Sequence, residues 1–94
     1  MIPDHLQSTW DLLKRAYPSG IPTSDYLAVL AVLYPHMSDR NLAQVAATFT
    51  GKTLGIVTND VYAVGAGGRV TPESVAEVRK RLDRVGLAEW LLEE

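Results

Sequence analysis

Nine consecutive apolar or aromatic residues, Tyr26–Tyr34, limit how this chain can fold more than any other feature of its sequence. Two prolines and a glycine between residues 18 and 22 break any helix arriving from the N-terminal side, and Pro35 ends the run. A hydroxyl at position 23 or 24 provides an N-cap and Asp25 a first-turn acid, so we predict a helix, although a run this short also fits a buried strand. Because this helix has no charged face to show to water, we expect the other helices to surround it.

The composition fits one small soluble domain. Ninety-four residues are enough for a single core, so we expect one domain, residues 1–94. Cysteine is absent, which excludes disulfides and cysteine-ligated zinc, and there is neither a basic N-terminal leader nor an apolar run of membrane-spanning length. We therefore expect a cytoplasmic protein that makes no membrane contact. Nine basic and eleven acidic side chains give a net charge of −2, so a nucleic-acid partner would need a local basic patch.

Three further segments place apolar residues along one face of a helix. We predict helices from about Asp4 to Tyr17, from Ser38–Asp39 to a C-terminal Gly51, and from a Thr71 N-cap to Gly86. The apolar positions are Leu6, Trp10, Leu13 and Tyr17 in the first helix, Leu42, Val45, Ala46 and Phe49 in the second, and Val75, Val78, Leu82 and Val85 in the third. The last residues, 87–91, should fold a final turn back onto the bundle.

Leu54–Val64 is harder to assign. Its first residues suit a strand, whereas the valines from Val57 to Val64 keep helical spacing behind a possible Thr58 cap, with Asp60 in the first turn. No other segment alternates with period two, so a strand would have no partner, and we predict a short helix. The predicted fold class is therefore all-α: a compact single-domain bundle of about five helices around a buried central helix.

Several short motifs follow one another in a specific order along nearly the whole chain. They are Tyr17-Pro18-x-Gly20-Ile21-Pro22-x-x-Asp25-Tyr26, Ser38-Asp39, Val45-Ala46, Thr58-x-Asp60-Val61, Thr71-Pro72-Glu73, and Arg81-Leu82 with Gly86. In this order they resemble a small actinobacterial family of helical proteins catalogued only as a domain of unknown function, and the first motif is the most specific. The resemblance implies a bundle of about five helices and brings no activity, cofactor or catalytic residue.

The turn with its two prolines and glycine is a candidate interaction surface. It is stiffer than a simple connection requires, and the tyrosines that flank it would present a small aromatic surface. The residues of this candidate surface are Tyr17, Pro18, Gly20, Pro22, Asp25 and Tyr26. We expect an unidentified protein partner, and a chain that is itself a monomer or a weak dimer.

The last long helix carries a candidate basic patch, which consists of Arg79, Lys80, Arg81 and Arg84. Glu77 lies four residues before Arg81, and Asp83 lies four residues after Arg79, so much of this charge can be balanced locally. A solvated helix face is the simpler explanation, and an acidic partner or a nucleic-acid backbone is the alternative.

Two glycine-containing segments suggest anion binding but also fit simpler structures. Gly51-Lys52-Thr53 matches only the end of a phosphate-binding loop, so a helix C-cap explains it better. Gly65–Arg69 combines glycines with an arginine ahead of a helix N-terminus, an arrangement that can hold a small anion. Because Pro72 removes one donor there and Glu73 repels an anion, we favour a flexible turn and keep an anion binder as the alternative.

Leu42–Ala46 followed by Gly51 is typical of the first helix of a helix-turn-helix motif. The second helix would begin near Thr53, yet Lys52 is the only basic residue between Asn41 and Gly68. Because phosphate contacts dominate DNA affinity, we do not expect a nucleic-acid partner for this pair of helices.

No set of residues predicts catalysis or metal binding. His5 and His36 are the only histidines, and neither has a second ligand at helical spacing. No serine pairs with a histidine by spacing, and most aspartates stand where helix N-termini favour acids. We therefore expect no catalytic residue, no metal and no cofactor, and we predict a non-catalytic protein–protein interaction module.

Overall fold

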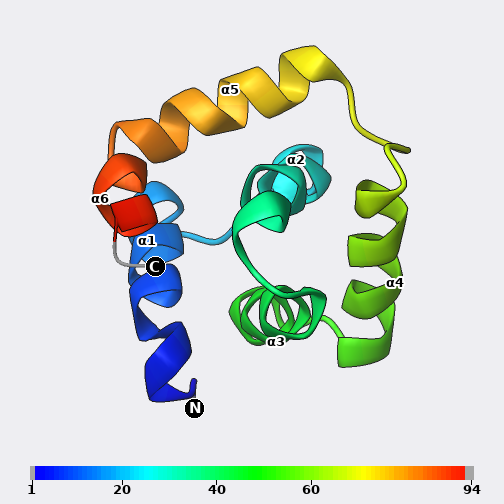
Figure 1. Cartoon of the computed structure of the whole chain (residues 1–94), viewed down its shortest axis with the longest axis horizontal. Helices are drawn as coiled ribbons and strands as arrows, with labels where there is room; N and C mark the ends of the chain where they lie inside the picture. The colour runs from blue at the N-terminus through cyan, green and yellow to red at the C-terminus, as the bar shows by residue number, and fades with distance from the viewer. Residues whose placement is uncertain (1, 93–94) are drawn as a thin grey trace.

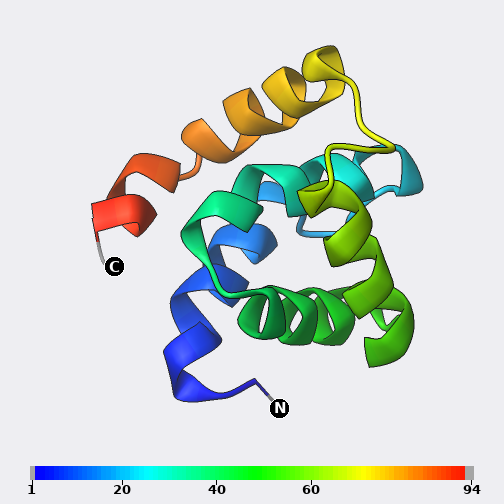
Figure 2. The ribbon, with the colours of Figure 1, turned by 45° about the vertical axis from the view of Figure 1, so that its right-hand side comes forward.

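The computed structural model describes residues 2–92, and every regular element in this part of the chain is helical (Figures 1 and 2). The elements are η1 (Asp4–Leu6), α1 (Gln7–Ala16), α2 (Thr23–Leu33), η2 (Tyr34–His36), α3 (Asp39–Thr50), α4 (Leu54–Gly65), α5 (Pro72–Asp83) and α6 (Leu87–Leu92), where η marks a 3-10 turn. The prediction of an all-α fold is confirmed. The helix predicted from about Asp4 to Tyr17 consists of two elements, the 3-10 turn η1 and the helix α1.

The helices cross one another instead of lying side by side. In Figure 1, α3 is seen end-on, α1 and α4 lie on opposite sides of the molecule, and α5 runs across one end between them. α2 contacts α3, α4 and α5, whereas α1 contacts α3, α5 and α6. The turned view shows α5 passing over the α2 end of the molecule and α3 lying at the opposite end (Figure 2).

Apolar side chains from all six α-helices form the core. From α2 alone, the buried residues are Tyr26, Ala28, Val29, Leu30, Val32 and Leu33. The predicted stripe of α4 is also buried, with Val57, Val61 and Val64 facing inward. At the C-terminal end, Trp90 is 4% exposed and its indole Nε1 donates to the Thr9 hydroxyl at 3.0 Å, so α6 packs back onto α1.

Three helix ends have the capping chemistry that the sequence predicts. The Ser38 hydroxyl accepts the Asn41 backbone N–H at 3.1 Å at the start of α3, and Gly51 ends that helix in the left-handed region, at φ 78°. At the start of α5, the Thr71 hydroxyl accepts the Ser74 N–H at 3.1 Å, while the Ser74 hydroxyl accepts the Thr71 N–H at 3.3 Å. These caps fix the first residues of α3 and α5.

The hydroxyl cap predicted for α2 is wrong. The helix already includes Thr23, and the residue before it, Pro22, serves as the N-cap without a side-chain hydrogen bond. The extended backbone of Pro22 directs its carbonyl into the helix, where it accepts the N–H groups of Asp25 at 2.9 Å and Tyr26 at 3.1 Å. The proline therefore both ends the preceding turn and starts the helix, and Asp25 lies in the first turn as predicted.

The short helix predicted within Leu54–Val64 is confirmed as α4, whereas the possible cap at Thr58 is wrong. Its N-cap is Thr53, whose carbonyl accepts the Val57 N–H at 3.1 Å. Thr58 lies inside the helix, and its hydroxyl donates to the Leu54 carbonyl at 2.8 Å instead of capping an end. Because Gly51 already reverses the chain, the helix can start directly after a three-residue turn, and Asp60 falls in its middle.

Gly65, the last residue of α4, lies against the ring of Tyr34. A Cβ atom at this position would stand 2.5 Å from the Tyr34 hydroxyl oxygen and 2.8 Å from its ring carbon Cε1. Such distances are far below van der Waals contact, so any larger residue at position 65 forces the Tyr34 ring to shift.

We expect Gly65→Ala to lower the free energy of unfolding by about 1–3 kcal/mol, because the Tyr34 ring must move out of its packed position. Gly55 is the matched control, since it lies inside the same helix with nothing within 4 Å of an added Cβ. Gly55→Ala should raise the stability by up to about 1 kcal/mol through better helix propensity. Urea denaturation followed by circular dichroism measures both, and effects of the same sign would contradict this packing.

Candidate functional site

The predicted surface at the turn between α1 and α2 is not aromatic. Tyr17 is 2% exposed and Tyr26 is 6% exposed, so neither ring is presented to a partner. The Tyr17 hydroxyl donates to the Asp25 carboxylate at 2.9 Å, and the Arg81 guanidinium lies 4.7 Å from the centre of the Tyr17 ring. What remains exposed of the predicted surface is Pro18, Gly20 and Pro22.

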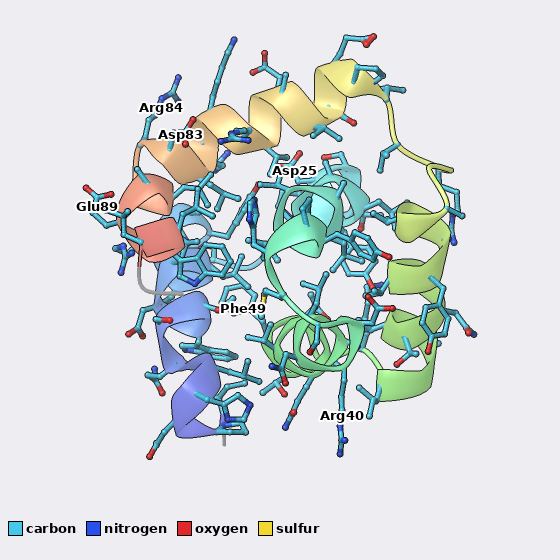
Figure 3. The ribbon with its side chains drawn as sticks, in the orientation of Figure 1. Asp25, Arg40, Phe49, Asp83, Arg84 and Glu89 are labelled. Atoms are coloured by element: carbon cyan, nitrogen blue, oxygen red, sulfur yellow. The ribbon has the colours of Figure 1, made fainter. Side chains whose placement is uncertain are left out.

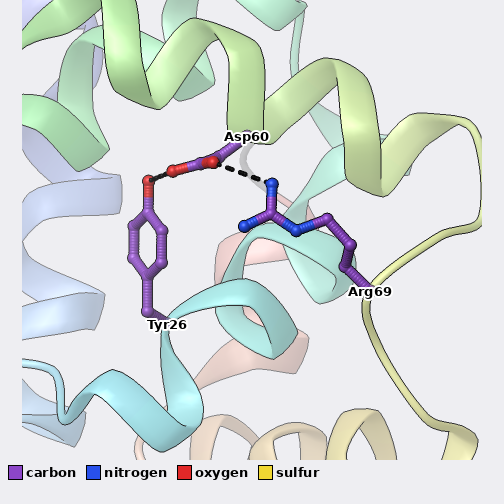
Figure 4. A network of polar contacts seen from close by, with 3 residues as sticks. All are labelled: Tyr26, Asp60 and Arg69. Carbon is purple, nitrogen blue, oxygen red and sulfur yellow. Dashed lines mark hydrogen bonds and ion pairs between the residues drawn. The ribbon is translucent and has the colours of Figure 1, made fainter.

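The second tyrosine of the turn is bound to a buried carboxylate (Figure 4). The Tyr26 hydroxyl of α2 donates to Asp60 Oδ2 of α4 at 2.8 Å, and the Arg69 guanidinium pairs with Asp60 Oδ1 at 3.2 Å. Asp60 is 9% exposed, and a carboxylate buried to this extent is tolerated only when donors and an opposite charge surround it. The three side chains therefore join α2, α4 and the turn before α5.

Both tyrosine hydroxyls are strongly held in their neutral form. Burial raises the pKa of Tyr17 and of Tyr26, and the carboxylates that accept their hydrogen bonds, Asp25 and Asp60, raise it further. The nearby arginines oppose this effect only partly. The two hydroxyls consequently act as hydrogen-bond donors of the core.

The glycine-rich turn, Gly65–Arg69, uses its arginine inside the fold. Arg69 adopts φ 72°, a left-handed conformation that residues with side chains rarely adopt, and its guanidinium pairs with Asp60. The start of α5 behind it is closed by the Thr71–Ser74 capping box. The arginine that would hold a small anion in the alternative interpretation thus already has an internal carboxylate beside it.

The structure divides the predicted basic patch of α5. Arg81 Nε donates to the Ala16 carbonyl at 3.0 Å, so this side chain ties α5 to the end of α1. Lys80 Nζ lies 3.7 Å from Glu77 Oε1. The ion-pair partner of Glu77 is therefore Lys80, whereas the sequence spacing suggested Arg81. Arg79 and Arg84 are exposed, and Figure 3 shows Arg84 pointing away from the body of the molecule.

The outer face of α4 is the clearest candidate for a binding surface. Asp60 is the only charged residue of this helix, and it points inward to Tyr26. We call the remaining outward residues the α4 face: Leu54, Gly55, Ile56, Thr58, Asn59 and Tyr62. Leu54, Ile56 and Tyr62 are 56%, 54% and 58% exposed, and only one other large apolar side chain among the described residues, Leu92, is similarly exposed. An exposed apolar surface without charge is typical of a protein-binding site.

A groove of about 570 Å³ runs between α3 and one edge of the α4 face. Leu54, Thr58 and Tyr62 line it from α4, each about one helical turn after the other. The α3 wall consists of Asp39, Arg40, Ala43 and Gln44. The groove therefore offers apolar contacts along α4 and polar groups of both charge signs along α3.

α3 and α4 have the arrangement of a helix-turn-helix, because the three-residue turn 51–53 joins two helices that cross. The second helix of such a motif enters a nucleic-acid groove only when basic residues contact the phosphates. α4 contains no basic residue, and Lys52 in the turn lies over the Tyr26 ring, 4.9 Å from its centre. The outward chemistry of α4 suits a protein surface better.

The amino-acid sequence of the chain matches a protein-family model over nearly its whole length. A family model described as "Protein of unknown function (DUF3349)" matches residues 4–93. The chain belongs to this family. The resemblance to a domain of unknown function is thus confirmed, and the DUF3349 match includes all of α4. No curated protein and no solved structure matches the chain significantly.

The sequence interpretation missed the α4 face because it left open where within Leu54–Val64 the helix begins. With a first turn near Thr58, Leu54 and Ile56 fall outside the helix and their shared exposure is not visible. A start at Leu54 places Gly55, Asn59 and Tyr62 opposite the buried valines, in a helix whose single charge, at Asp60, borders the buried side. The absence of charge on the side facing water was the available signal.

Other parts of the structure give weaker evidence of ligand binding. A pocket of about 270 Å³ at the start of α2 is lined in part by Ile21, Tyr26, Phe49 and Lys52, and Lys52 is its only charged residue. Within residues 2–92, no three histidine, aspartate or glutamate side chains gather closely enough to hold a metal ion. None of the helices in this part of the chain is both long enough and apolar enough to cross a membrane.

The buried tyrosines predict how stability responds to alkaline pH. The pKa of Tyr17 is raised in the folded protein. The Tyr17 hydroxyl therefore contributes fully to the free energy of unfolding below about pH 10, where the unfolded side chain is also neutral. Above that pH the unfolded chain loses the proton and the folded one keeps it, so each such tyrosine lowers the free energy of unfolding by about 1.4 kcal/mol per pH unit. Tyr17→Phe should reduce the slope by this amount in urea denaturation between about pH 10 and 12. Equal slopes for the two proteins would contradict the assignment.

Proposed function

We propose that this protein is a non-catalytic protein–protein interaction module and that it binds its partner through the α4 face. The observation that carries the proposal is the combination of exposed Leu54, Ile56 and Tyr62 on a helix with no outward charge. A cluster of large apolar side chains on a water-facing helix is typical of a surface that a partner covers. A tyrosine beside aliphatic residues is also a common anchor of protein interfaces.

One feature of the α4 face and one of α5 favour a protein partner over nucleic acid. Apolar contacts give affinity only when both surfaces lose water, which a second apolar protein surface allows. Nucleic-acid binding instead depends on cations, and the most basic helix, α5, directs Arg81 to the end of α1 and pairs Lys80 with Glu77.

The proposal places the binding surface on α4 and not on the turn between α1 and α2. Tyr17 and Tyr26 would have been the anchors of that turn, and both are buried with their hydroxyls bonded to carboxylates. The groove beside α4 extends the proposed surface, because it adds polar groups of α3 such as Arg40 and Gln44 to the apolar contacts. An interface with an apolar centre and a polar rim matches this distribution.

We expect Tyr62→Ala to abolish recovery of the partner when the tagged protein is drawn from native lysate at low salt. Removing one anchor of an interface typically weakens binding by about 2 kcal/mol or more, which is roughly thirtyfold. Leu92→Ala is the matched control, since Leu92 is an exposed leucine on α6 and lies outside the proposed surface. Mass spectrometry with and without nuclease identifies what is recovered.

The proposal requires that the wild-type protein and Leu92→Ala recover the same proteins and that Tyr62→Ala does not. Recovery that Tyr62→Ala leaves unchanged would place the partner on another surface. Recovery that disappears with nuclease, and also on changing Arg79 and Arg84 to glutamate, would favour the basic helix instead.

A further inference from the structure

We infer that the pocket at the start of α2 binds a small carboxylic acid with an apolar body. The pocket has a volume of about 270 Å³. It lies between the segment that enters α2, residues 20–26, and the end of α3 with the turn that follows it, residues 49–52. It shares no lining residue with the groove beside the α4 face, so the inference does not rest on the proposed function.

The charge of the pocket comes from a single lysine. Lys52 is the only charged residue of the lining, and its Nζ lies 4.9 Å from the centre of the Tyr26 ring, which also lines the pocket. Neither of the ion pairs formed among the described residues involves Lys52. A cation at the wall of a pocket attracts an anion, and this one has no described carboxylate paired with it.

The acidic residues of the neighbouring helices are bonded elsewhere. The Asp25 carboxylate accepts the Tyr17 hydroxyl at 2.9 Å. Asp60 lies at the hydroxyl end of Tyr26, from which it accepts a hydrogen bond at 2.8 Å (Figure 4). Neither carboxylate belongs to the pocket lining, so the positive charge of Lys52 is not balanced there by an acid.

Two aromatic rings and one aliphatic side chain form the apolar part of the wall. The Phe49 ring packs edge-on against Trp10, with 4.9 Å between the ring centres. The buried Tyr26 is fixed through its hydroxyl, and Ile21 adds aliphatic surface from the turn before α2. An acid with an apolar body gains contacts with these surfaces that a bare inorganic anion does not gain.

The backbone around the pocket is restricted before any ligand enters. Gly20 and Gly51 adopt left-handed conformations, with φ 102° and 78°, and the ring of Pro22 limits the backbone between Gly20 and α2. The Lys52 N–H donates to the Thr50 hydroxyl at 3.3 Å, which holds the start of the lysine beside the pocket. A site that is already ordered loses less conformational entropy on binding. The stiff turn before α2 thereby has a role that a simple connection would not need.

The single cation and the small volume define the class of ligand. One lysine matches one carboxylate, whereas a phosphate group carries nearly two negative charges. Drug-sized ligands occupy pockets of about 300–1,000 Å³, so this pocket takes a smaller molecule. The hydroxyl of Thr23, an exposed residue of the lining, can donate a second hydrogen bond to the carboxylate.

Benzoate is the probe for this site, and NMR spectra of the isotope-labelled full chain report its binding. We expect benzoate to shift the backbone amide signals of residues 20–26 and 49–52 with a Kd of about 1 mM, an affinity that ligands of this size reach. Benzamide has nearly the same shape without the charge, and acetate has the charge without the ring. Each should bind roughly tenfold more weakly than benzoate.

Lys52→Gln should weaken benzoate binding by roughly tenfold, because it removes the charge and keeps most of the side chain. Lys80→Gln is the matched control, since Lys80 is an exposed lysine of α5 outside the pocket, and it should bind benzoate like the wild type. Lys52 is itself exposed, and the spectrum of each free variant shows directly whether it is folded.

The inference is overturned if none of the amide signals of residues 20–26 and 49–52 moves at about 20 mM benzoate. It is also overturned if benzamide or acetate binds as tightly as benzoate, or if a folded Lys52→Gln binds benzoate like the wild type. The lysate experiment with Tyr62→Ala judges the proposed function separately.

Discussion

The buried carboxylate of Asp60 is the constraint on which the arrangement of α4 depends. A charge in this position is stable only while Tyr26 donates to it at 2.8 Å and Arg69 pairs with it at 3.2 Å. These contacts fix how α4 is rotated about its axis, because the one charged side chain of the helix must face α2. The opposite side of α4 is consequently left with uncharged residues, and the exposed Leu54 and Tyr62 lie there because of this rotation.

Polar contacts between distant residues also fix how the other helices cross. The Tyr17 hydroxyl bonds to Asp25 and so joins the end of α1 to the start of α2. Arg81 of α5 donates to the Ala16 carbonyl at the end of α1, and Arg15 of α1 donates to the Val85 carbonyl just after α5. These two hydrogen bonds connect α1 with the C-terminal end of α5. Apolar packing supplies most of the stability but is not directional, and these hydrogen bonds determine which crossing is adopted.

The sequence predicted the local features well and the long-range ones poorly. Apolar spacing and the caps at Ser38 and Thr71 located α3 and α5, because both signals depend on residues close together in the chain. The burial of Tyr26 depends on Asp60, 34 residues away, and no local pattern reveals that pairing. The α4 face was also not visible in any local pattern. The start of α4 at Leu54 follows from the geometry of the turn at Gly51 and not from a hydroxyl cap that the sequence would show.

The central claim, that α4 carries the binding surface, is tested most directly by site-specific photo-crosslinking in native cells. A photoreactive amino acid replaces Tyr62 on α4, Ser19 in the turn between α1 and α2, or Lys80 on α5, three exposed positions on three different surfaces. If α4 carries the binding surface, a discrete cross-linked protein product forms from position 62 and none from positions 19 and 80. A product from position 19 or 80 without one from position 62 would contradict it.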